Sequence, residues 1–102
     1  MSRNVSQSLD APAAWKAWTT SGSPDAAAQF LARIQSWTDG TAAQLTRGAA
    51  HHPRSVVTRS EIAAALHHEL GVLAGGEPVT YLVALNQARR NVIEGLRSRT
   101  AP

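Results

Sequence analysis

The sequence contains no cysteine, which excludes disulfide bonds, thiolate nucleophiles and thiolate metal ligands. It also has no apolar stretch long enough to cross a membrane, because a histidine pair and Glu69 interrupt the longest candidate, residues 62–73. The first ten residues lack the apolar run of a signal peptide. We therefore expect a cytoplasmic protein with no membrane segment.

The usual signatures of catalysis and cofactor binding are absent as well. No glycine motif for phosphates is present, and Gly71, Gly75 and Gly76 are typical of helix termination. The histidines occur as the pairs His51–His52 and His67–His68, without the spacing of metal ligands on a helix. A metal site would require both pairs to meet in space. The sequence therefore predicts a protein without metal, cofactor or catalytic residues.

Basic residues outnumber acidic ones, giving a formal net charge of +3, and nine of the ten basic residues are arginine. A charge of this size is compatible with a polyanionic partner but does not require one. The basic residues are scattered along the chain except at its C-terminal end. There Arg89, Arg90, Arg97 and Arg99 are accompanied by only one acidic residue, Glu94.

Helical patterns dominate what is present. No segment alternates apolar and polar residues as a strand does, and a chain of 102 residues is long enough for one domain with a core. We expect a flexible N-terminal segment over residues 1–9 and a single helical domain over residues 10–102. The predicted fold class is all-α, a compact bundle of four or five helices with a C-terminal antiparallel helical hairpin.

Two helices are predicted in the N-terminal half. Asp10 can cap a helix that runs to about Thr20. Ser23 can cap a second one, extending over Ser23–Thr38, for which Gly40 is the expected stop. Residues 41–50 carry one large apolar side chain, so the helical pattern there is weak.

The C-terminal hairpin is predicted by stronger signals. Thr58 and Glu61 form a capping box at the start of one helix, and Gly75 and Gly76 stop it. The final helix is expected over Glu77–Arg99, with Pro78 in its first turn. Its apolar stripe is predicted to contain Leu82, Leu85, Val92, Ile93 and Leu96.

Arg89 interrupts this stripe. If the turn is centred on Gly75 and Gly76, Arg89 lies level with Ile62, and Glu69 lies level with Leu82. The alternatives for Arg89 are an acid from the N-terminal half, an external partner, or a rim position from which the side chain reaches water. We rank the rim position first.

Five residues are candidates for a binding surface. Arg89 is predicted to mark its edge, shared with Arg90 and Arg97. Trp15 and Trp18 are three residues apart on one helix and share a face. Arginine and tryptophan are both enriched at the energetic centres of protein interfaces.

The leading functional prediction is a non-enzymatic helical interaction protein that binds a protein partner or itself. The alternative is a small DNA-binding regulator, because residues 59–66 resemble the first helix of helix-turn-helix units, which implies the last helix as the recognition helix. A third pattern, Arg47 followed by His52 at Arg-x-x-x-x-His spacing, resembles the motif of the HEPN ribonucleases and covers these two residues alone.

Overall fold

The computed structural model describes residues 10–49 and 57–100. The predictions for residues 1–9 and for His51 and His52 lie outside the described residues. The described part forms five helices: α2 (Ala11–Ser21), α3 (Pro24–Arg33), α4 (Gln35–Ala49), α5 (Arg59–Ala74) and α6 (Tyr81–Thr100). The predicted all-α bundle of four or five helices is therefore confirmed.

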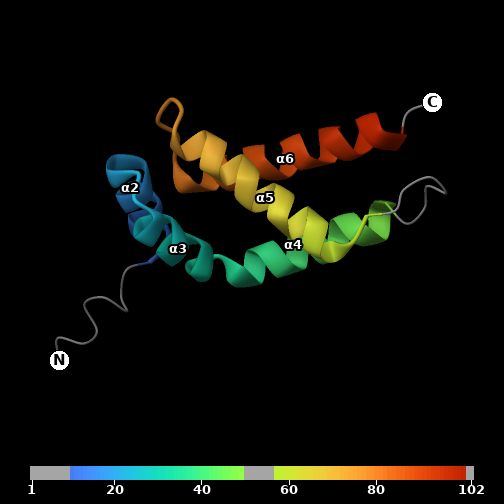
Figure 1. Ribbon diagram of the computed structural model, residues 1–102, viewed down its shortest axis with the longest axis horizontal. Helices are drawn as coiled ribbons and strands as arrows, with labels where there is room; N and C mark the ends of the chain where they lie inside the picture. Colours follow the sequence, from blue (N-terminus) through green and yellow to red (C-terminus); the bar gives the residue numbers. More distant parts are fainter. Residues whose placement is uncertain (1–9, 50–56, 101–102) are drawn as a thin grey trace.

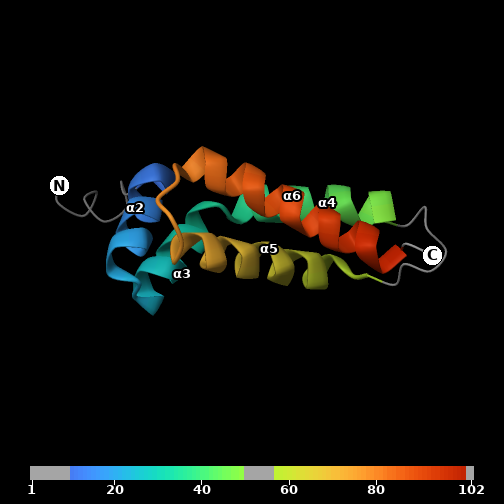
Figure 2. The same cartoon turned by 90° about the horizontal axis from the view of Figure 1, so that it is seen from above.

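The helices are arranged as a long section and an end piece. α4, α5 and α6 run along the long direction of the molecule, and the α2–α3 pair closes one end (Figure 1). α5 packs extensively against both α4 and α6, whereas α4 and α6 contact each other much less. Figure 1 accordingly shows α5 between α6 and α4, and in the view of Figure 2 α5 lies on one side while α6 and α4 overlap on the other.

Both N-terminal helices begin where their capping residues predict. The Asp10 carboxylate accepts a hydrogen bond from the Ala13 amide at 3.1 Å, and the Ser23 hydroxyl accepts one from the Ala26 amide at 3.1 Å. Each bond satisfies an amide that has no partner within its own helix. Between the two helices, Gly22 adopts a left-handed conformation with φ of 66°, which glycine reaches without steric cost.

The prediction of one helix over Ser23–Thr38 was wrong. The helix is interrupted at Ile34, where φ is −102° and ψ is 18°, and α4 then continues through Gly40 to Ala49. The interruption lets the chain change packing partner, because α3 packs on α2 and α4 packs on α5. Gly40 is exposed, and a Cβ atom there would meet nothing within 4 Å. A helical glycine costs about 1 kcal/mol, which the packing of α4 can offset.

The start and end of α5 were predicted correctly. The Glu61 amide donates to the Thr58 hydroxyl at 3.1 Å, and the Thr58 amide donates to the Glu61 carboxylate at 3.0 Å. This reciprocal pair is the predicted capping box. At the other end α5 stops at Ala74, and Gly75 is its C-cap.

The last helix begins at Tyr81 rather than at Glu77, so the predicted start was wrong and Pro78 lies in the connection. The Thr80 hydroxyl accepts a hydrogen bond from the Val83 amide at 3.3 Å and acts as the cap. The indole N–H of Trp15 donates to the Val79 carbonyl at 2.8 Å. This bond ties the connection to α2 immediately before the Thr80 cap.

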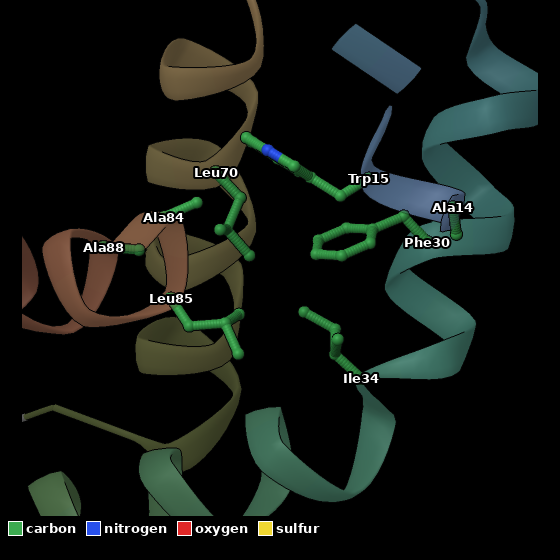
Figure 3. Close-up of a cluster of buried hydrophobic side chains, with 8 residues drawn as sticks. All are labelled: Ala14, Trp15, Phe30, Ile34, Leu70, Ala84, Leu85 and Ala88. Carbon is green, nitrogen blue, oxygen red and sulfur yellow. The ribbon is translucent and has the colours of Figure 1, made fainter. Parts of the chain in front are cut away.

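Two clusters of buried side chains form the core. The first lies between the α2–α3 pair and the hairpin, and Figure 3 shows Phe30 and Ile34 pointing across it toward Leu70 and Leu85. The second lies among α4, α5 and α6, and its buried members are Ala42, Ile62, Leu66 and Val92. Trp37 packs against both clusters and links them.

The buried face of α6 contains most of the predicted stripe, since Leu85 and Val92 are buried, but it departs from the prediction at Leu82. Ala84 and Ala88 are fully buried, whereas Leu82 is 61% exposed. The amide nitrogen of Asn91 donates to the Glu69 carboxylate at 3.0 Å, so Glu69 lies level with Asn91 and not with Leu82. The longer connection displaces the turn toward α6, and this shift brings a different set of residues against α5 and α2.

Thr38 offers a test of the core packing. Its side chain is fully buried, and its hydroxyl has no hydrogen-bond partner in the structure. A buried hydroxyl without a partner loses its hydration and gains nothing in exchange. We expect Thr38→Val, which keeps the shape and the helix propensity, to raise the free energy of unfolding by about 1 kcal/mol in urea denaturation.

Thr46→Val is the matched control for this substitution. The Thr46 hydroxyl donates to the Ala42 carbonyl at 2.6 Å, so its removal relieves no unpaired group. The control is expected to be neutral or destabilising. Equal stabilisation by both substitutions would show that a general preference for valine, and not the unpaired Thr38 hydroxyl, causes the effect.

Candidate functional site

The three predicted arginines lie on one face of α6. Arg89, Arg90 and Arg97 are all exposed, and the period of 3.6 residues per turn brings them to the same side of the helix. We define the outer face of α6 as the stripe that steps along the helix by three or four residues and faces away from the core: Leu82, Asn86, Arg89, Arg90, Ile93 and Arg97. The rim position ranked first for Arg89 is consistent with this placement.

Exposed aliphatic side chains lie at the start of the same helix. Leu82 is 61% exposed, and its neighbour Val83 is 50% exposed. Ile93, further along the outer face, is half-buried. Two of the three large hydrophobic side chains that are exposed in the described part of the chain therefore belong to α6. The sequence places Leu82 in an apolar stripe, and only its packing environment reveals that this side chain faces solvent.

The charge of the outer face is mainly positive. Glu94 is exposed beside it, four residues after Arg90 and three before Arg97. Pairs at these spacings on a surface contribute a few tenths of a kcal/mol. Arg97 also interacts with another group of the chain. Arg89 and Arg90 thus supply the two central charges of the face.

The two candidate tryptophans have a different environment. Trp15 is 3% exposed, and its ring centroid lies 5.6 Å from that of Trp18 in an edge-to-face arrangement. Such aromatic pairs stabilise a fold beyond the area that they bury. Trp18 is half-buried, so it is the member of this pair with surface to offer a partner. The structure thus separates the candidates into an exposed arginine group and a largely internal tryptophan pair.

Two clefts accompany the hairpin. A cleft of about 540 Å³ lies between α2 and the α5–α6 connection, with Trp15, Leu73 and Tyr81 among its lining residues. A smaller one of about 220 Å³ lies between α5 and α6 and includes Glu61 and Glu69.

Metal ligands do not gather anywhere in residues 10–49 and 57–100, since no group of three His, Asp or Glu side chains there could hold an ion. The Nε2 atom of His67 is buried and has no hydrogen-bond partner, while His68 is exposed. Arg47 is exposed on α4. The helices of these same residues include none that is both long and apolar enough to cross a bilayer.

The hairpin geometry bears on the DNA-binding alternative. Leu70 packs in one cluster with Ala84 and Leu85, and Ile62 packs in the other with Val92, so α5 and α6 run antiparallel along much of their length. Residues 75–80 connect them. A helix-turn-helix unit instead crosses at roughly 90–120° after a turn of about three or four residues. The predicted antiparallel hairpin is therefore present, with a longer connection than that unit has.

The fold and the site together define a small all-α protein with a basic, partly apolar face on its last helix. No protein-family model matches the chain, and neither curated proteins nor solved structures give a match. The functional argument accordingly depends on the residues themselves.

Proposed function

We propose that this protein is a non-enzymatic helical interaction protein that binds another protein chain through the outer face of α6, in a regulatory or assembly role. The observation that carries the proposal is the exposure of Leu82 and Val83 on a helix that also presents Arg89, Arg90 and Arg97. Exposed aliphatic groups beside arginines are typical of protein interfaces. The cytoplasmic location stays a prediction.

The second candidate is a small DNA-binding regulator. It is supported by the same three arginines, since guanidinium groups on one helix face can contact phosphates. The antiparallel packing of α5 and α6 gives less support to a helix-turn-helix mode. The two candidates differ in their response to salt, because phosphate binding weakens steeply as salt rises.

Photo-crosslinking tests the proposed function. A benzophenone amino acid is placed at Leu82, and the matched control carries it at Gln29, an exposed position on α3. In lysate of the cells that express the protein, position 82 is expected to give a discrete protein adduct and position 29 none. Arg89→Met should weaken the adduct, while the free energy of unfolding changes by no more than about 0.5 kcal/mol, because Arg89 is exposed.

Three outcomes would contradict the proposed binding face or favour the alternative function. Adducts of equal yield from both positions would contradict a binding face on α6. Tight binding of duplex DNA that falls steeply with salt and is lost in Arg89→Met would favour the regulator. Unfolding of Arg89→Met would show that this arginine stabilises the fold rather than a complex.

A further inference from the structure

We propose that the outer face of α6 takes an acidic amphipathic helix of another protein. The inference rests on the proposed function and adds the chemistry and shape of the partner. It combines three observations: the spacing of the stripe, its charge, and its failure to complement itself.

The stripe has the spacing of a helix–helix seam. Leu82, Asn86, Arg89 and Ile93 follow one another at steps of four, three and four residues, the alternation by which two helices stay in contact. Arg97 follows Ile93 after four more residues, at the end of the stripe. From Leu82 to Arg97 the stripe is about 22 Å long at 1.5 Å per residue. A partner helix of about four turns matches this length, and its apolar residues would meet Leu82 and Ile93.

The charge of the stripe determines the charge of the partner. Arg89 and Arg90 occupy its middle, and Glu94, exposed four residues after Arg90, is the one acidic residue beside it, so positive charge predominates three to one. Guanidinium groups pair with carboxylates through two parallel hydrogen bonds, and their aliphatic stems cover apolar surface. A helix with Glu or Asp beside its apolar positions therefore complements both the charges and the aliphatic groups of this face.

A second copy of the chain does not complement it. In a parallel pairing each arginine would oppose the same arginine of the other copy. In an antiparallel pairing centred between residues 89 and 90, Arg89 of one copy would oppose Arg90 of the other. In any register, two copies would bring together the arginines at 89, 90 and 97 of both chains against only one acid, Glu94, from each. Like charges brought together at an interface oppose association. The face thus favours a different, acidic chain over self-association.

Nucleic acid fits the face less well than an acidic helix does. Phosphate contacts would use Arg89, Arg90 and Arg97, but they would leave Leu82, with 61% of its surface exposed, without an apolar partner. Affinity for a phosphate backbone comes mainly from charge neutralisation and ion release. An amphipathic helix uses both the arginines and the aliphatic groups.

Two designed peptides of about 20 residues test the inference, a length set by the four-turn stripe. Both carry leucines at the same seam positions, and the remaining positions are mainly Glu in one peptide and mainly Lys in the other. Binding to the full chain is measured by fluorescence anisotropy at physiological salt. We expect the Glu peptide to bind at least about tenfold more tightly than the Lys peptide, because charge complementarity discriminates between partners.

Charge reversal on the protein locates the binding face. The double variant Arg89→Glu/Arg90→Glu is expected to weaken binding of the Glu peptide by at least about tenfold. The matched control Arg47→Glu reverses an exposed arginine on α4 and should change the affinity by less than about twofold. Leu82→Ser should weaken binding as well, which a purely ionic attraction would not require. Circular dichroism verifies that each variant stays helical.

Equal affinity for the two peptides, or an equal loss of affinity in the Arg47→Glu control, would overturn the inference. So would binding of duplex DNA that Arg89→Glu/Arg90→Glu abolishes, if the Glu peptide does not bind. A dimer in sedimentation equilibrium that the same double variant converts to monomer would overturn it as well. If crosslinking from position 82 captures a protein while the Glu peptide shows no preference, the inference on partner chemistry is wrong and the proposed function stands. If crosslinking and peptide binding both fail, the proposed function is wrong too.

Discussion

Replacing Phe30 with alanine is expected to lower the free energy of unfolding by about 3–5 kcal/mol. The Phe30 side chain is fully buried, and its ring lies 5.1 Å from that of Trp15 and 5.8 Å from that of Trp18, measured between centroids. Tyr81 contacts it edge-on at 6.3 Å. Removal of the ring leaves a cavity among three helices, which their neighbouring aromatic rings cannot easily fill.

Urea denaturation followed by tryptophan fluorescence measures this effect. Gln29→Ala is the matched control, because Gln29 precedes Phe30 in α3 and is exposed. The control should change the free energy of unfolding by no more than about 0.5 kcal/mol. A loss below about 1 kcal/mol for Phe30→Ala would mean that the aromatic cluster is loosely packed, contrary to the structure.

Leu66→Ala is expected to cost about 2–5 kcal/mol of stability, the range for a fully buried leucine. Leu66 has no exposed surface and lies in the second cluster with Ile62 and Val92. Leu82→Ala, the same chemical change at a site that is 61% exposed, should alter stability by no more than about 0.5 kcal/mol.

The contrast between these two leucines tests the orientation of α6. The sequence places both Leu66 and Leu82 in apolar stripes. Equal losses of stability in the two alanine variants would therefore indicate that Leu82 is buried as the sequence predicts, contrary to the structure. Thermal denaturation of both variants under the same conditions gives the comparison. A large loss of stability in Leu82→Ala alone would likewise show that Leu82 is buried and does not belong to the outer face of α6.

Local signals were sufficient for the helix ends that have capping residues. Asp10, Ser23 and Thr58 each begin a helix through their own side chains, and Gly75 caps the end of α5. These interactions span three or four residues, so nothing distant decides them. The number and type of the helices follow from the same kind of information.

Contacts between distant segments decided the features that were predicted wrongly. The break at Ile34 depends on α3 and α4 having different packing partners. The residues before α6 make a distant contact, since the Trp15 indole donates to the Val79 carbonyl 64 residues along the chain, although the Thr80 cap that begins the helix is local. Ala84 is buried and Leu82 is not, because Ala84 packs with Leu70 and with side chains of the α2–α3 pair. A periodic pattern in one segment contains none of this information.

The exposed position of the candidate arginines was predicted, and their role in binding stays a prediction. Arg89 was recognised because a charged residue interrupts an apolar stripe, and its exposure agrees with a rim position. The exposure of Leu82 was missed, since an aliphatic residue in a helical stripe is usually assigned to the core, and Val83 was assigned to neither face. Their exposure becomes visible only when the neighbouring helices are in place.

The hydrogen bond from Trp15 to Val79 has a consequence for synthesis on the ribosome. Its two residues are separated by 64 positions, which at about 5–20 residues per second takes roughly 3–13 s to translate. During that interval α2 has been synthesised but the hairpin segment that contains Val79 has not. The indole N–H of Trp15 is therefore hydrogen-bonded to water. Closing so large a loop also slows folding, since non-local contacts form late. The nascent chain can therefore pack α2 on α3 early, but the indole N–H of Trp15 gains its acceptor only after Val79 has been translated.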